Sequence, residues 1–106
     1  MRYHVHLAEE AAQDLNQIFD YIAYELESVI NADRQLKRIE KEIMALDTMP
    51  FRYRIYEMEP WLSLGVRRFS VDQYCIFYLP DENTKTVSVL RVLYGGRDID
   101  SIMSVD

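Results

Sequence analysis

Apolar residues change their spacing along this 106-residue chain, and each change predicts a different element. Residues 2–7 alternate between apolar side chains and two histidines, which predicts a β-strand. From Ala8 onward the apolar residues recur every three or four positions, as on one face of an α-helix. The same spacing resumes after Ser28, a suitable N-cap residue, and stops at Pro50. The pattern therefore predicts two amphipathic helices that form an antiparallel hairpin. Acidic residues suit the dipole at the start of the first helix: Glu9, Glu10 and Asp14.

Three further strands are predicted in the second half of the chain, at about residues 64–71, 73–80 and 86–94. The last two are apolar on both faces, which is typical of strands that are covered on both sides of a sheet. The helical hairpin covers only one side. The C-terminal segment or a binding partner must therefore cover the other side.

These elements predict an α+β fold of two layers within a single domain, residues 1–106. An N-terminal strand precedes an antiparallel helical hairpin, which packs on an antiparallel sheet with a three-stranded C-terminal meander. The single cysteine, Cys75, excludes an internal disulfide and lies in an apolar run, so we expect a small buried side chain.

The net charge of −6 is unevenly distributed. Acidic residues dominate positions 1–50, whereas positions 65–97 are locally basic. An acidic total argues against tight non-specific binding to nucleic acid, but it allows a local basic patch.

Two histidines and a distant cysteine cannot form a closed zinc site, and no phosphate-binding or dinucleotide-binding loop is present, so no metal or cofactor is expected. With no signal peptide or membrane span in the sequence, we expect a cytoplasmic protein.

Arginine and tyrosine residues in the last third are the candidates for function. The candidate target-binding residues are Arg67, Arg68, Arg91, Tyr94 and Arg97, and Arg52 and Arg54 form a secondary basic loop. Each of these residues also has an alternative interpretation, in which it has only a structural role. Alternation sends Arg67 and Arg68 to opposite faces of the sheet, and it places Arg91 on a face with Val87, Val89 and Leu93.

Arg91 is either paired with an acid such as Asp98 or directed into a functional groove. Likewise, Arg97 and Asp98 form either a structural salt bridge at the strand exit or part of a site, with Gly95-Gly96 supplying a tight turn.

The order of elements and several motifs resemble the RelE/ParE family of bacterial toxin–antitoxin toxins. The resemblance covers nearly the whole chain, and its most specific part is the final block, 90–99, with the sequence LRVLYGGRDI. This block resembles the ParE branch, although Tyr94 stands where a histidine is common and Gly96 where an alanine is common. The other matching motifs are Ala12, Asp14-Leu15, Ile18 and Tyr21-Ile22 on the first helix; Ile39, Ile43, Leu46 and Pro50 on and after the second; and Gly65, Arg67-Arg68-Phe69, Tyr74 and Ile76-Phe77-Tyr78 in the sheet.

The resemblance implies a growth-inhibiting toxin that a cognate antitoxin neutralises by folding over the sheet face and the helical hairpin. ParE-like members bind DNA gyrase and trap its cleaved-DNA state. RelE-like members instead cleave mRNA on the ribosome, which requires proton-transfer groups. Here those groups are missing near the arginines, since His4 and His6 lie on the first strand and are expected to be exposed. The gyrase function is therefore favoured.

The ribosome-dependent mRNA interferase remains the alternative, with the five candidate residues as its catalytic groups. A non-toxic homologue that only binds the antitoxin is the third. A homodimer and a toxin–antitoxin hetero-oligomer are both compatible with the sequence.

Overall fold

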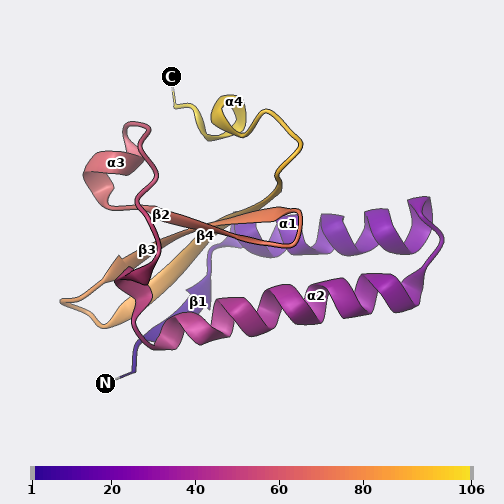
Figure 1. The fold of residues 1–106 in the computed structure, drawn as a ribbon, viewed down its shortest axis with the longest axis horizontal. Helices are drawn as coiled ribbons and strands as arrows, with labels where there is room; N and C mark the ends of the chain where they lie inside the picture. Colours follow the sequence, from indigo (N-terminus) through magenta and orange to yellow (C-terminus); the bar gives the residue numbers. More distant parts are fainter. Residues whose placement is uncertain (1, 106) are drawn as a thin grey trace.

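The computed structural model describes residues 2–105 and places a helical hairpin on a four-stranded sheet (Figure 1). The strand order is β1-β4-β3-β2. Strands β2, β3 and β4 form the predicted antiparallel meander, and β1 pairs with β4 in parallel. The predicted two-layer α+β fold is confirmed, with a mixed sheet. The principal elements are β1 (His4–Leu7), α1 (Glu9–Asp20), α2 (Val29–Met44), β2 (Arg67–Val71), β3 (Tyr74–Asp81) and β4 (Thr86–Tyr94).

The parallel pairing of β1 follows from the hairpin between β1 and β2. Helix α1 runs along the sheet in one direction and α2 returns in the other, so the chain comes back to the end of the sheet where β1 begins, and β2 runs in the same direction as β1 (Figure 1). Two antiparallel steps through β3 then give β4 the direction of β1. No helix within residues 2–105 combines the length and apolar character needed to cross a bilayer.

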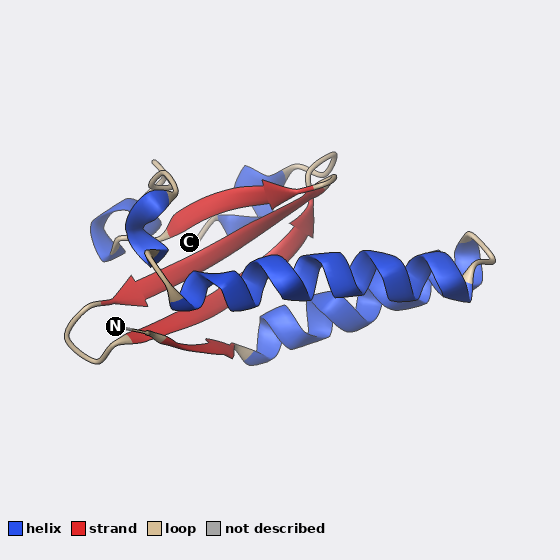
Figure 2. Cartoon of the chain, turned by 60° about the horizontal axis from the view of Figure 1, so that its bottom comes forward, coloured by secondary structure: helices blue, strands red, loops and turns tan. Residues whose placement is uncertain are grey.

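The helical layer packs along one face of the sheet (Figure 2). Helix α1 continues into a π-helical turn, Tyr21–Glu25, and the Ser28 hydroxyl then caps α2 by accepting a hydrogen bond from the Asn31 N–H at 3.2 Å. The predicted helical faces are buried against β2, β3 and β4. Among the fully buried side chains of this core are Ile39, Leu46, Ile76, Tyr78, Val87 and Val89.

The second face of the sheet is covered by the chain itself. A short helix α3 (Trp61–Leu64) and the C-terminal helix α4 (Ile99–Met103) lie over it (Figure 1). Trp61 Nε1 donates to the Met103 carbonyl at 2.6 Å, which ties the two segments together. The sequence predicts the C-terminal segment or a partner on this face, and the C-terminal segment contributes α4 to it. The core beneath contains Tyr56, Val66, Cys75, Phe77, Leu93 and Met103.

Two details of the strands differ from the sequence prediction. Strand β2 begins at Arg67 rather than at residue 64, because Trp61–Leu64 form a helical turn that Gly65 ends with a φ of 90°. A β-bulge also interrupts β4, since Phe77 pairs with Arg91 whereas Tyr78 pairs with Val89. The extra residue reverses the alternation beyond it. Val92 therefore packs on the helical side and Leu93 on the opposite side, so the prediction that Leu93 shares a face with Val87 and Val89 is wrong.

The buried Tyr78 hydroxyl should make the fold sensitive to alkaline pH. It donates to the Pro50 carbonyl at 2.6 Å, and burial raises the pKa of Tyr78 to about 12 from 10.0. The folded state favours the neutral phenol of Tyr78. The contribution of this phenol to the free energy of unfolding is therefore complete below pH 10 and is lost as the pH rises toward 12. Tyr78→Phe should cost about 1 kcal/mol at neutral pH and flatten the fall in stability above pH 10.

Urea denaturation between pH 8 and pH 11.5, a range set around the ordinary tyrosine pKa of about 10, measures both effects. Tyr24→Phe is the matched control, since the Tyr24 side chain is 70% exposed and should leave the alkaline slope unchanged. Equal slopes for the wild type and Tyr78→Phe would contradict the assignment.

Candidate functional site

A buried carboxylate on α1 fixes the position of β4. Asp14 Oδ2 accepts hydrogen bonds from Arg91 Nε at 2.8 Å and from the Val92 N–H at 2.9 Å, and Oδ1 accepts from the second Arg91 nitrogen at 3.0 Å. Asp14 is 7% exposed. Strand β1 pairs with β4 only as far as Val89, and Asp14 supplies an acceptor for the Val92 N–H beyond that point.

Arg91 is therefore engaged within the molecule. Its partner is Asp14, not Asp98, and the hydrogen bonds raise the pKa of the Arg91 guanidinium. Asp98 instead caps α4 by accepting from the Ser101 N–H at 3.3 Å. No ion pair joins Arg97 to Asp98 in the part of the chain that the structure describes.

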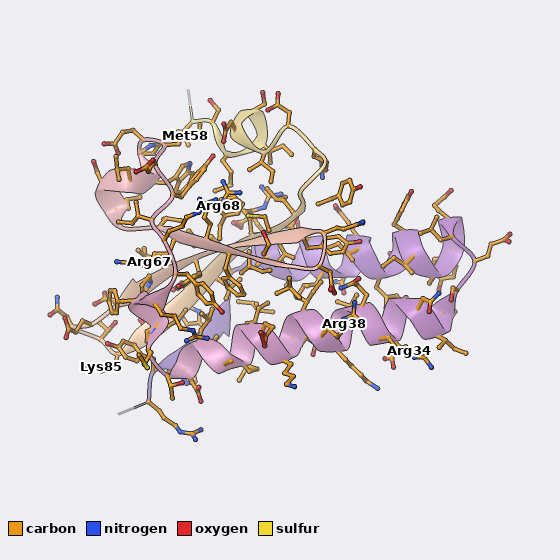
Figure 3. The ribbon with its side chains drawn as sticks, in the orientation of Figure 1. Arg34, Arg38, Met58, Arg67, Arg68 and Lys85 are labelled. Atoms are coloured by element: carbon orange, nitrogen blue, oxygen red, sulfur yellow. The ribbon has the colours of Figure 1, made fainter. Side chains whose placement is uncertain are left out.

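The arginine pair on β2 is split between the two faces of the sheet, as the alternation predicts. Figure 3 shows Arg68 on the side that carries Met58 and Arg67 on the other side. Arg67 donates to the carbonyls of Phe51 and Tyr53, at 3.1 and 2.6 Å. Because these carbonyls belong to the segment between α2 and β2, Arg67 fixes that segment to the sheet.

Arg68 lies at a cleft on the second face of the sheet. Most residues that line this cleft are polar, and we call it the polar cleft. It has a volume of about 480 Å³ and is lined by Arg54, Tyr56, Met58, Arg68 and Asp100 among others. The Arg68 guanidinium lies 5.6 Å from the centre of the Tyr56 ring and 5.5 Å from that of Phe77. Tyr56 donates to Asp100 at 2.6 Å, and burial together with this bond raises the pKa of the phenol.

Arg52 does not join Arg54 in the polar cleft. Its guanidinium donates to the Thr48 and Met49 carbonyls at 2.6 and 3.1 Å, and it stacks on Tyr53 at 4.7 Å. The predicted secondary basic loop therefore contributes Arg54 to the polar cleft, whereas Arg52 bonds to the turn at Thr48 and Met49 that follows α2.

Tyr94 and Arg97 meet at another cleft, which lies between α1, the π-helical turn, the start of β3 and the end of β4. It has a volume of about 550 Å³. Three tyrosines line it, and we call it the tyrosine cleft. The Tyr74 and Tyr94 rings make a T-shaped contact at 5.9 Å, and burial, followed by the nearby Tyr94 and Tyr21, raises the pKa of Tyr74. Its lining includes Tyr21, Leu26, Tyr74, Tyr94 and Arg97.

Both glycines after β4 shape the edge of the tyrosine cleft. The Gly95 N–H donates to the Gln73 carbonyl at 2.7 Å, and a Cβ on Gly95 would lie only 3.2 Å from that oxygen. A Cβ on Gly96 would collide with the Tyr94 ring. The glycine pair therefore lets the chain turn closely past β3 and lets the Tyr94 ring fold back over the turn.

A third cleft runs between the two helices and the edge strand β1, and we call it the hairpin groove. It has a volume of about 520 Å³, with Leu15, Phe19, Leu36 and Met44 among its apolar lining. Asp33 and Glu40 from α2 make it acidic. The sequence-predicted residues thus do not form one site. They divide between the tyrosine cleft, the polar cleft and internal contacts, and no three potential metal ligands gather within residues 2–105.

Comparison with known proteins identifies the family. A family model described as the ParE toxin of the type II toxin–antitoxin system, parDE, matches residues 5–99. The chain belongs to the ParE toxin family. A search of curated proteins returned no match.

Solved structures share the ParE-family fold of this chain at low sequence identity. The chromosomal ParDE toxin–antitoxin system from P. aeruginosa is 18% identical, with a TM-score of 0.73 over 88% of this chain and 96% of that chain. The toxin–antitoxin complex RelBE2 from Mycobacterium tuberculosis is 21% identical, with a TM-score of 0.67 over 89% and 99%. The archaeal RelE–RelB complex from Pyrococcus horikoshii is 16% identical, with a TM-score of 0.64 over 92% and 99%.

Sequence reasoning missed three residues of these sites. Asp14 was assigned to the helix dipole, yet it occupies a position three residues after Ala11 and four before Ile18, on the buried stripe of α1. A carboxylate on such a stripe indicates a buried partner. Tyr21 and Tyr74 were noted only as positions that match the family motifs, and nothing in the helical and strand patterns showed that they meet in the fold.

Removing the charge of Asp14 should destabilise this ParE-family fold strongly. Asp14→Asn keeps the shape but leaves Arg91 without an anion, so the free energy of unfolding should fall by roughly 3 kcal/mol. Urea denaturation at pH 7 measures the loss. Asp33→Asn is the control, because Asp33 pairs with Lys37 on the exposed helix surface and its loss should stay within about 0.5 kcal/mol. Similar losses in the two variants would refute the anchoring role.

Proposed function

We propose that this protein is the toxin of a type II toxin–antitoxin module and acts by poisoning DNA gyrase. The observation that carries the proposal is the match of the ParE family model to residues 5–99. Two features of the chain support it. The net charge of −6 disfavours an RNA-binding surface, and Arg67 and Arg91 are engaged in internal hydrogen bonds. Gyrase and its DNA are cytoplasmic in bacteria, so the function assigns the toxin to that compartment.

The proposed neutralising partner is an antitoxin with an apolar segment that fits the hairpin groove. The structural neighbours from P. aeruginosa and M. tuberculosis are described as a toxin–antitoxin system and complex, which supports a partner of this kind. In this chain Leu7 and Met44 leave 41% and 58% of their surface exposed at the groove. Glu40 favours a basic residue on the antitoxin segment, whereas Asp33 is already paired with Lys37. The second face of the sheet, by contrast, is filled by α3 and α4.

The alternative function, a ribosome-dependent ribonuclease, depends on the polar cleft. Arg54 and Arg68 both line it and are suited to hold phosphate. Proton transfer is the weak point, because the raised pKa of Tyr56 makes it a poor base and Tyr56 already donates to Asp100. His4 and His6 lie on β1, at the opposite edge of the sheet from β2.

Induction of the gene alone should stop DNA synthesis before protein synthesis. Pulse-labelling with thymidine and methionine within minutes of induction compares the two, and a trapped gyrase should also leave double-strand breaks. Protein synthesis failing first, without breaks, would replace the gyrase function with the ribonuclease. No fall in either would leave the non-toxic antitoxin-binding homologue.

The polar cleft provides an independent test through Arg54, which is exposed and makes no ion pair within residues 2–105. Under the gyrase function, Arg54→Ala should leave growth inhibition within about twofold of wild type, since surface changes outside an interface have small effects. Under the ribonuclease function, loss of a phosphate-binding arginine should lower activity by about a hundredfold or more. Plating efficiency after induction, at matched protein levels, separates the two outcomes. Lys85→Ala, a change at a basic residue outside the tyrosine cleft, the polar cleft and the hairpin groove, is the control.

A further inference from the structure

The tyrosine cleft continues into an exposed apolar surface at the end of the helical hairpin. The hairpin tip, as we call it, has five large apolar side chains that are each more than half exposed: Tyr21 55%, Tyr24 70%, Leu26 57%, Val29 59% and Ile30 65%. Tyr21 and Leu26 also line the tyrosine cleft. The two features are therefore one continuous surface, and an apolar surface of this kind on a small protein marks an interaction site.

The π-helical turn determines where Tyr21 and Leu26 of the hairpin tip lie. Residues Tyr21–Glu25 follow directly on α1, and the Leu26 N–H donates to the Tyr21 carbonyl at 3.1 Å, five residues back. The wider turn allows the end of the helix to present Tyr21 and Leu26 to the cleft while Ile22 and Ala23 remain buried. Single π-helical turns within helices are frequent at functional sites.

The surface has opposite charges at its two ends. Arg97 lies at the cleft end, is exposed, and forms no ion pair within residues 2–105. The Asp14 carboxylate in the same cleft is already occupied by Arg91 and the Val92 N–H. Glu25 and Glu27 are exposed beside the hairpin tip. A ligand that spans the surface therefore meets a cation at one end and two carboxylates at the other.

These properties select a protein segment over a nucleic acid. Binding to nucleic acid depends on several cations that neutralise phosphates, and this surface provides one arginine beside acidic residues. Tyrosine-rich apolar surfaces with a charged rim are instead typical of protein interfaces, where tyrosine and arginine supply most of the binding energy.

We propose that the tyrosine cleft and the hairpin tip together dock a segment of gyrase, an inference that rests on the proposed function. The segment inserts an aliphatic or aromatic side chain between Tyr21, Tyr74 and Tyr94. It presents a carboxylate to Arg97 and a basic residue to Glu25 and Glu27, so the two charge pairs fix its direction along the surface. Arg67 and Arg91 take no part, since both are held by internal acceptors.

Gly96 gives a way to move Tyr94 without removing it. Because a Cβ at this position would meet the ring of Tyr94, Gly96→Ala displaces the ring from the edge of the cleft. The φ of Gly96 does not lie in the left-handed region, so the backbone accepts alanine. Tyr94 and Gly96 are also the two positions at which the chain departs from the usual ParE pattern. The absence of a Cβ at Gly96 makes room for the ring of Tyr94.

The test measures binding of the full-length protein to immobilised gyrase holoenzyme by surface plasmon resonance. Leu26→Ser and Tyr94→Ser should each weaken binding about tenfold or more, as expected for central interface residues, and Gly96→Ala should weaken it several-fold. Arg97→Glu should weaken binding and reduce its salt dependence, because one of the two charge pairs becomes repulsive while the other stays attractive. Met49→Ser is the control for an exposed apolar side chain, because Met49 is 74% exposed and lies outside both features. Thermal unfolding confirms that each variant is folded.

The outcomes separate this inference from the proposed function. If the wild-type protein does not bind gyrase, both fail. If it binds and the cleft variants bind within twofold of the Met49→Ser control, the docking surface is wrong while the gyrase function stands. If a DNA oligonucleotide alone binds the wild type and competes for the cleft, the occupant is nucleic acid and the inference is overturned. A loss of binding confined to the cleft and tip variants supports it.

Discussion

The buried Asp14 carboxylate is the contact on which the arrangement of the helical layer over the sheet depends. It satisfies two nitrogens of Arg91 and the backbone N–H of Val92, and so joins α1 to β4 at the bulge. A buried charge without partners carries a large desolvation cost, so helix and strand are held in one relative position. The tyrosine cleft lies beside this contact and has Asp14 in its wall, and its shape therefore depends on the same three hydrogen bonds.

The two-layer architecture was predictable because the hydrophobic spacing changes clearly from strand to helix and back. The helical faces and the buried Cys75 appear in the structure as the sequence indicates. Local strand alternation could not reveal the bulge near Arg91, since an inserted residue leaves the composition of β4 unchanged but reverses the faces of Val92 and Leu93. The helical turn at Trp61–Leu64 was missed because four residues are too few to show a helical period, and only its last residue was assigned to the predicted strand.

The candidate site was less predictable, because residue type does not show which groups are already satisfied. Arg67 and Arg91 have the chemistry of ligand-binding arginines, yet both bond to acceptors within the chain that are distant in sequence. Tyr94 and Arg97, two of the five candidate residues, do lie together in the tyrosine cleft. Their neighbours Tyr21 and Tyr74 come from a helix end and a strand start, and only the packing of α1 on the sheet brings them to the same cleft.

The π-helical turn also accommodates one extra residue in the hairpin. An α-helical turn closes with a bond four residues back, whereas the Leu26 N–H bonds to Tyr21, five residues back. Because the wider turn absorbs the extra residue, Ile22 and Ala23 remain buried like the stripe of α1 that precedes them. Deleting one residue from Tyr21–Glu25 would close an ordinary α-helical turn, so this segment is the part of the hairpin in which a change of length should disturb the packing of the two helices least.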